Sequence, residues 1–131
     1  MSRAILDTSI FIAEEHGRPL DERLPAEVAI SVVTLAELEV GILVTDDEPT
    51  RSRRIRTLLA ARERATGLPV DQRVASAYAE LAAAALRAGR RPRVQDTWIA
   101  ATAAVHDAAV WTRDRDFSVF TVFEGVDVVS V

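Results

Sequence analysis

The stretch Ala4-Ile5-Leu6-Asp7-Thr8-Ser9 decides the fold, because it passes from an apolar run to polar residues within a few positions. The apolar run predicts a short buried strand over residues 3–6, and Thr8 or Ser9 is a suitable cap for a helix that reaches about Glu15. A strand that leads directly into a helix is typical of α/β folds. Asp7 then lies at the carboxyl end of a strand, which is the edge where such sheets bind ligands.

The same alternation continues along the chain. Further strands are predicted at residues 28–31, at Val70, at 109–112 and at 126–131. Helices are predicted where apolar residues recur at helical spacing. One begins with Thr34 as its cap, and three others cover residues 50–65, 72–88 and 96–107. In the helix over 50–65, Ile55, Leu58 and Leu59 are expected to face inward, and one helical turn is expected between Pro19 and Pro25.

This order predicts a three-layer α/β fold with a mainly parallel central sheet of about five strands flanked by helices. With 131 residues the chain is long enough for one sizeable core, so we expect a single domain over residues 1–131. No apolar run reaches the roughly 18 residues of a membrane span. The start lacks a signal-peptide pattern, so we expect a cytoplasmic protein without membrane contact.

The residue types also exclude several classes of site. The chain has no cysteine, which removes disulfides and thiolate metal sites. All 16 basic residues are arginine, so a P-loop with its phosphate-binding lysine cannot be built. Dinucleotide binding lacks the Gly-x-Gly-x-x-Gly signature after a strand.

Charge is divided unevenly along the chain. Residues 51–93 hold eleven arginines against three acids, a balance of +8, whereas the remainder has a balance of −12. This polarity suits a protein that holds a polyanion next to metal ions. We expect Arg53, Arg54 and Arg56 to contact the polyanion; the alternative is that they only solvate a helix face.

Acidic residues recur where an α/β fold brings them to one edge of its sheet. They are Asp7 after the first strand, Glu37 after the second, Asp96 at the start of a helix, and Asp114 and Asp116 after the fourth strand. Carboxylates gathered in this way repel one another unless a cation lies between them. Their oxygens suit Mg²⁺ or Mn²⁺, ions that activate water against phosphodiesters. Each acid alone could be a helix cap or a loop residue.

Four segments together resemble a known family. They are Leu6-Asp7-Thr8-Ser9, Thr34-Leu35-Ala36-Glu37-Leu38, Asp96-Thr97-Trp98-Ile99-Ala100-Ala101-Thr102-Ala103 and Thr112-Arg113-Asp114-Arg115-Asp116-Phe117. In this order and spacing the chain resembles the PIN domain, and more narrowly the VapC-type ribonuclease toxins of bacterial toxin–antitoxin pairs.

The resemblance implies an endoribonuclease that depends on Mg²⁺, with Mn²⁺ as the other suitable ion. It assigns Asp7, Glu37, Asp96 and Asp114 as catalytic residues, with Asp7, Asp96, Asp114 and the additional Asp116 as metal ligands. Thr8 and Thr112 match supporting positions. The implied partners are RNA, a small VapB-like antitoxin that blocks the active site, and a second copy in a homodimer. RNA would then be the polyanion that Arg53, Arg54 and Arg56 contact.

Two other functions remain open from the residues alone. A phosphatase or phosphotransferase would use Asp7 as its nucleophile, although a second acid two residues later and any lysine are missing. A non-catalytic α/β module would bind a protein partner through its arginine-rich region.

Overall fold

A computed structural model describes residues 3–20, 23–122 and 125–131. Five strands form one sheet in the order β3-β2-β1-β4-β5, and every neighbouring pair is parallel. The strands are β1 (Arg3–Leu6), β2 (Glu27–Ser31), β3 (Thr66–Leu68), β4 (Ala109–Thr112) and β5 (Asp127–Ser130). The predicted α/β class and the parallel sheet are confirmed.

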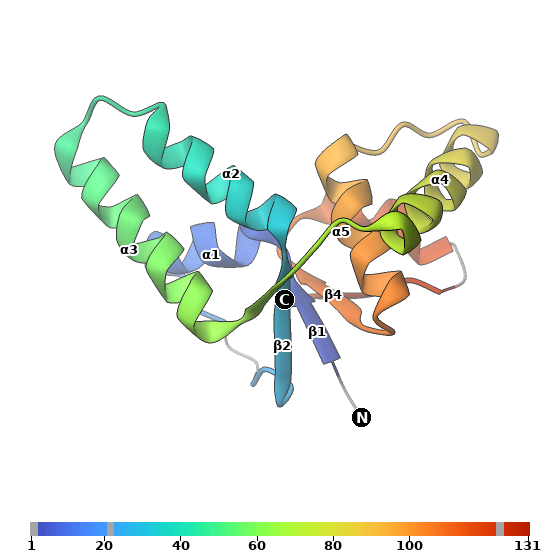
Figure 1. Ribbon diagram of the computed structural model, residues 1–131, viewed down its shortest axis with the longest axis horizontal. Helices are drawn as coiled ribbons and strands as arrows, with labels where there is room; N and C mark the ends of the chain where they lie inside the picture. The colour runs from blue at the N-terminus through green and yellow to red at the C-terminus, as the bar shows by residue number, and fades with distance from the viewer. Residues whose placement is uncertain (1–2, 21–22, 123–124) are drawn as a thin grey trace.

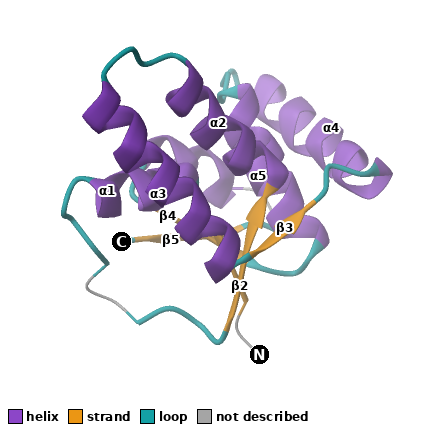
Figure 2. Cartoon of the chain, turned by 60° about the vertical axis from the view of Figure 1, so that its left-hand side comes forward, coloured by secondary structure: helices purple, strands orange, loops and turns teal. Residues whose placement is uncertain are grey.

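Helices cover both faces of this sheet. They are α1 (Thr8–Glu15), α2 (Val32–Leu43), α3 (Glu48–Arg64), α4 (Gln72–Arg87), α5 (Val94–Val105) and the 3₁₀ helix η1 (Arg115–Val122). Figure 1 shows α1, α2 and α3 on one side of the strands and α4 and α5 on the other. Figure 2 gives a second view of the same layers. The arrangement is the predicted three-layer fold.

Alternation along the strands produces two cores, one on each face of the sheet. Ile5 and Val110 point toward α4 and α5, whereas Leu6 and Trp111 point toward α1, α2 and α3. Successive side chains of a strand lie on opposite faces, so an uninterrupted apolar run is what a strand covered on both sides requires. The short apolar run of β1 thus contributes side chains to both cores.

The cap of α2 differs from the prediction. Ser31, not Thr34, is the N-cap, and its side chain accepts a hydrogen bond from the Val33 backbone N–H at 3.1 Å. Thr34 lies inside the first turn and is fully buried. Both residues are good caps by type, and the end of β2 at Ser31 decides between them.

The third strand also lies elsewhere than predicted. It covers Thr66–Leu68 instead of Val70, and it pairs with β2 at the edge of the sheet. A side chain at Gly67 would place its Cβ 3.2 Å from Leu35 Cδ1 of α2. Glycine therefore lets the helix approach this strand closely.

In α3 the predicted inward face is partly wrong. Leu58 is buried, as predicted, but Ile55 and Leu59 are 40% and 52% exposed. The helix begins at Glu48, earlier than predicted, because Asp47 caps it by accepting from the Thr50 backbone N–H. Between Pro19 and Pro25, the described residues form no helical turn, and residues 21–22 lie outside the described part.

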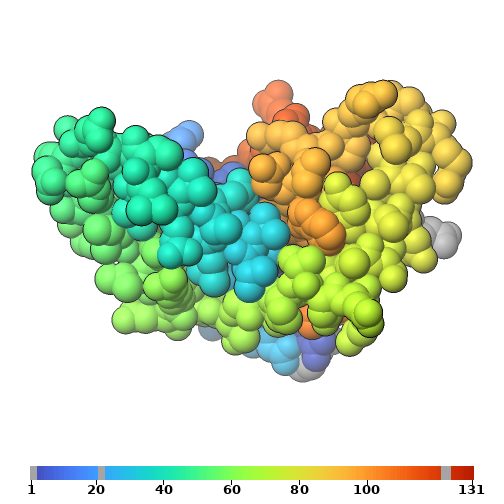
Figure 3. Space-filling view, turned by 45° about the horizontal axis from the view of Figure 1, so that its top comes forward, coloured from blue at the N-terminus to red at the C-terminus, as the bar shows by residue number. Residues whose placement is uncertain are grey.

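The carboxyl-terminal half of α2 exposes apolar side chains. Val40, Leu43 and Val44 are 56%, 80% and 70% exposed. Among the helices that the structure describes, none combines the length and the apolarity needed to cross a bilayer. Figure 3 shows the end of the α2–α3 hairpin, which carries these residues, at the left edge of the molecule.

Candidate functional site

Asp7 is the most firmly held of the predicted site residues. It follows β1, caps α1 and is 4% exposed. Its Oδ2 accepts hydrogen bonds from the Ser9 hydroxyl at 2.7 Å, the Thr112 hydroxyl at 2.9 Å and the Ser9 backbone N–H at 3.3 Å. A buried carboxylate needs such donors, because an unpaired one is costly.

Thr112, at the end of β4, connects two of the acids. Its hydroxyl donates to Asp7 Oδ2, and its Oγ1 accepts the backbone N–H of Asp114 at 2.9 Å. Because β1 and β4 are parallel neighbours, their carboxyl ends meet and bring Asp7 close to the loop that carries Asp114.

Glu37 is held from α1. The Thr8 hydroxyl donates to Glu37 Oε1 at 2.7 Å and lies 3.1 Å from the hydroxyl oxygen of Thr34. Glu37 is half-buried, and burial raises its pKa above the ordinary value despite the Thr8 hydrogen bond; the nearby Asp7 charge raises it further. Its carboxylate is thus oriented and is a stronger base than an exposed one.

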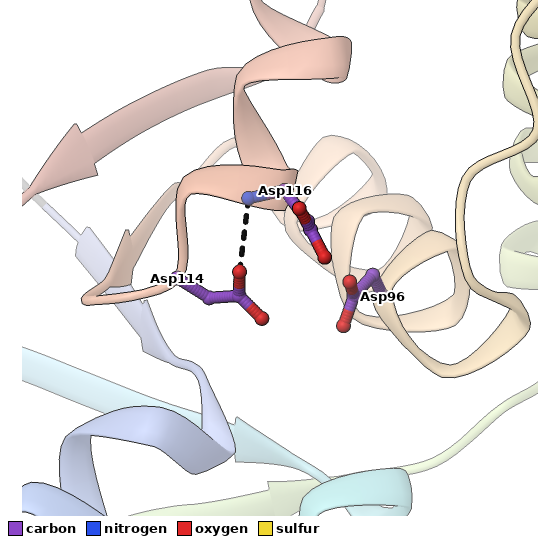
Figure 4. Close-up of side chains that lie close together, drawn as sticks. All are labelled: Asp96, Asp114 and Asp116. Carbon is purple, nitrogen blue, oxygen red and sulfur yellow. Dashed lines mark hydrogen bonds between the residues drawn. The ribbon is translucent and has the colours of Figure 1, made fainter.

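Three other acids converge on one point. Asp96 of α5, Asp114 of the loop after β4 and Asp116 of η1 each offer a carboxylate oxygen, and these oxygens lie within 4.8 Å of one another. Figure 4 shows the three side chains directed into a shared space, with the Asp116 backbone N–H donating to Asp114 Oδ1 at 2.9 Å. Asp7 and Glu37 do not belong to this tight group.

The Arg93 guanidinium bridges the three acids. Its Nε donates to Asp96 Oδ2 at 3.1 Å, and its Nη2 contacts Asp114 and lies 3.2 Å from Asp116 Oδ2. A planar guanidinium can serve several carboxylates at once. One positive group therefore contacts all three acids but offsets only part of their negative charge.

Electrostatics link this cluster to Asp7. Burial raises the pKa of Asp96 from its ordinary 3.8 to about 6; Arg93 opposes this shift, and the charges of Asp7 and Asp114 add to it. The Arg93 pKa is raised, mainly by Asp96. A cation bound between these ionised acids would reduce their mutual repulsion.

The donor set fits a divalent metal ion. It consists of carboxylate oxygens, which hard ions such as Mg²⁺ prefer, and it includes no thiolate or imidazole among the described residues of the cluster. Asp114 and Asp116 contact Nη2 of Arg93 and Asp96 contacts its Nε, so all three acids already face one cationic group.

The predicted RNA-contacting arginines lie apart from the three-acid cluster. Arg53 Nε is 3.9 Å from Glu15 Oε2, and Arg54 donates to the Gly41 carbonyl oxygen at 2.5 Å. Arg56 is exposed. Arg54 lines a pocket of about 310 Å³ between α1 and α2 that also reaches Thr8 and Glu37.

The sequence did not predict a site role for Ser9, Thr34 or Arg93. Ser9 donates to Asp7 and accepts the Arg113 backbone N–H at 3.0 Å, so it joins the two strand ends. The proximity of Ser9 to Asp7 in the sequence is a signal for such a contact. For Arg93, three positions before Asp96, helical spacing provided a comparable signal.

Comparisons with known proteins agree with the geometry. The PIN domain model matches residues 4–121. Ribonuclease VapC5 of Mycobacterium tuberculosis is 44% identical over 97% of this chain and 94% of its own length, and Ribonuclease VapC4 of the same organism is 36% identical over 98% and 97%. The crystal structure of VapBC-5, a member of the VapBC family of toxin–antitoxin systems from M. tuberculosis, matches with a TM-score of 0.90 and 40% identity over all of both chains.

The matches span nearly the whole chain, so they include every segment that carries the acids. The predicted resemblance is thereby confirmed. The chain belongs to the PIN domain family, within its VapC group of ribonuclease toxins.

Proposed function

We propose that this protein is a metal-dependent endoribonuclease and the toxin of a toxin–antitoxin pair. The observation that carries the proposal is the convergence of Asp96, Asp114 and Asp116 on one cation position beside the buried Asp7. A chain 44% identical over almost its full length is named a ribonuclease, which supports RNA as the substrate.

In this proposal Asp96, Asp114 and Asp116 bind the ion, together with Asp7. Mg²⁺, or Mn²⁺ in its place, lowers the pKa of water in such a site and offsets charge that develops on the scissile phosphate. Thr112 and Ser9 keep Asp7 Oδ2 in a fixed position, so the protein does not have to reorganise this acid when RNA binds.

Glu37 orients the attacking water and accepts its proton. The Thr8 hydrogen bond fixes Oε1, and the raised pKa makes the carboxylate a better proton acceptor. In-line attack by water on the phosphorus breaks the bond to the 3′ oxygen of the preceding nucleotide. The leaving 3′ oxygen takes up a proton from solvent, so the products are a 5′-phosphate and a 3′-hydroxyl.

An Asp7 nucleophile, as in a phosphatase or phosphotransferase, is less consistent with the contacts. Asp7 Oδ2 already accepts three hydrogen bonds, and the residue is 4% exposed. Hydrogen bonds that stabilise a carboxylate reduce its tendency to attack phosphorus. A purely protein-binding module would not require the acids to converge.

The proposed antitoxin partner has a suitable surface next to the acids. The pocket of about 310 Å³ between α1 and α2 is lined by Ile12, Leu38 and Val44 and reaches Glu37. Ile12 and Val44 are 45% and 70% exposed. An apolar segment of a VapB-like partner would cover them, and a basic side chain of that segment would enter the acidic cluster. A homodimer stays a prediction.

The direct test is to map cleaved 5′ ends in total RNA after brief expression of the wild type and of Asp7→Asn. Purified protein is assayed in parallel with Mg²⁺ and with EDTA. We expect new 5′-phosphate ends with the wild type only, and no cleavage in EDTA. Full activity in EDTA would refute the proposed metal dependence.

A further inference from the structure

A basic pocket adjoins the acidic cluster on the side of the α4–α5 loop. It has a volume of about 400 Å³. Its charged lining consists of Arg90, Arg91, Arg93, Arg115 and Asp116, completed by Pro92, Ser118 and Val119. Because Arg93 and Asp116 also belong to the acidic cluster, the pocket and the cluster are continuous.

Three of these arginines are available to a ligand. Arg90, Arg91 and Arg115 are exposed, and no carboxylate among the described residues lies within ion-pair distance of them. Nor does any described side-chain hydrogen bond involve their guanidinium groups. A phosphate that binds here gains its contacts without breaking contacts inside the protein.

The loop that carries Arg90 and Arg91 has a defined backbone. Gly89, at φ +74°, ends α4, and the Arg90 backbone N–H donates to the Ala85 carbonyl at 2.8 Å. Pro92 fixes its own φ and restricts Arg91 to extended conformations. The α5 amino terminus follows at once, and its cap residue Arg93 makes no side-chain cap hydrogen bond. These features preorganise the loop for an anion.

The arginines of α3 differ in this respect. Arg51, Arg62 and Arg64 pair with Glu48, Glu39 and Glu14. Arg53 and Arg54 are engaged by Glu15 and the Gly41 carbonyl. Among the described contacts of α3, Arg56 alone has no such partner. Four of the six arginines of α3 are therefore paired with carboxylates, whereas Arg90 and Arg91 of the same basic region have no described carboxylate partner.

We infer that the pocket of Arg90, Arg91 and Arg115 binds a backbone phosphate of the RNA strand that flanks the cleaved bond. This inference rests on the proposed function and adds the path of the substrate to it. The occupant is a nucleic-acid phosphate and not an acidic protein segment, because the pocket joins the three-acid cluster directly and a strand held there places its next phosphates beside those acids. Such contacts position the strand without reading its sequence.

The test compares three charge-matched triple variants in EDTA, where the proposed metal dependence predicts no cleavage. The pocket variant is R90Q/R91Q/R115Q, the α3 variant is R53Q/R54Q/R56Q, and the control is R18Q/R23Q/R87Q, whose arginines are exposed and do not line the pocket. The probe is a short fluorescein-labelled single-stranded RNA of mixed sequence. Its affinity is measured by fluorescence anisotropy over a series of salt concentrations.

Each phosphate contact contributes about 0.7 to the slope of log affinity against log salt for single strands. Loss of the phosphate bound in the pocket should therefore flatten the slope by about 0.7 in the pocket variant. The α3 variant should flatten the slope by less than this, because Arg56 alone lacks a partner among the described contacts of α3, and the control should keep the wild-type slope. R90K/R91K/R115K should recover part of the affinity, because lysine retains the charge but not the planar fork.

A wild-type slope in the folded pocket variant would overturn the inference, as would an equal loss in the control. Loss of affinity for a purified acidic partner protein with RNA affinity intact would also overturn it and would assign the pocket to that partner. Cleavage by the wild type in Mg²⁺ is measured separately. If the wild type cleaves RNA and the pocket variant keeps the wild-type slope, the inference alone is refuted. If the wild type does not cleave RNA, the proposed function is refuted.

Discussion

Thr112 Oγ1 and Asp7 Oδ2 lie 2.9 Å apart, with the hydroxyl donating and the carboxylate accepting, and both residues are buried. The same oxygen of Thr112 accepts the Asp114 backbone N–H. One threonine at the end of β4 thus fixes an acid of the neighbouring strand and the start of the loop that carries Asp114. This contact couples the sheet to the geometry of the acidic cluster.

Thr112→Val should reduce the binding free energy of Mn²⁺ by more than it reduces the free energy of unfolding. Valine preserves the shape, but Asp7 loses a donor and the Asp114 N–H loses its acceptor, at a cost of about 1–3 kcal/mol in unfolding free energy. Thr102→Val is the control, since Thr102 is also fully buried and donates to the Trp98 carbonyl within α5. Urea unfolding gives stability, and Mn²⁺ titration calorimetry gives affinity. Equal Mn²⁺ affinity in both variants would contradict a supporting role of Thr112.

The acids could be located from the sequence because each follows a recognisable boundary. The apolar runs of β1 and β4 end at Asp7 and shortly before Asp114, and parallel strands bring those ends together. The third strand was missed because Thr66-Gly67-Leu68 has neither alternation nor β-branched residues beyond Thr66. Its pairing with β2 and the close approach of Leu35 determine it, and both are tertiary contacts.

The division of the basic region could not be read from charge alone. The balance of residues 51–93 does not say which arginines face carboxylates. Glu14 and Glu15 lie on α1, far from α3 in the sequence, and they neutralise Arg64 and Arg53 only after the helices pack. Likewise, Arg93 meets Asp114 and Asp116 only because the α4–α5 loop lies beside η1.

Stability without metal should fall as the pH rises toward neutrality. The pKa of Asp96 is about 6 in the folded chain against an ordinary 3.8, so the folded state binds this proton more tightly than the unfolded state. The stabilisation is complete below pH 3.8 and is lost as the pH rises through about 6. Between pH 5 and pH 7.5 the loss from this group is about 1 kcal/mol. The raised pKa of Glu37 acts in the same direction.

This pH dependence is checked by urea unfolding in EDTA at both pH values. Asp96→Asn should flatten it, whereas Asp127→Asn, an exposed acid of β5, should retain it. Mg²⁺ affinity should show the opposite trend and rise with pH, because the ion requires the ionised acids. A wild type that is more stable at pH 7.5 than at pH 5 would contradict the assigned shift.

Arg93→Gln should increase the affinity for Mn²⁺ and lower the stability of the metal-free protein. In the wild type a metal ion must displace the guanidinium that bridges Asp96, Asp114 and Asp116. Without that competitor the acids repel one another until metal binds. Arg91→Gln is the control, because Arg91 lies on the same loop without a described ion pair. Calorimetry and thermal unfolding measure the two effects, and lower Mn²⁺ affinity in Arg93→Gln would identify Arg93 as a positioning residue instead.

The last prediction concerns inhibition by the antitoxin. The acids already accept the guanidinium of Arg93, so an arginine from a partner is a suitable inhibitor of the same cluster. The partner arginine would compete with Mg²⁺, and its affinity should therefore fall as Mg²⁺ rises. Asp96→Asn should bind the partner less tightly, whereas Asp127→Asn should bind it as the wild type does. Titration calorimetry with the product of the neighbouring gene, at low and high Mg²⁺, provides the measurement. If neither Mg²⁺ nor Asp96→Asn changes the affinity, the partner does not enter the acidic cluster. Inhibition must then come from coverage of the pocket between α1 and α2.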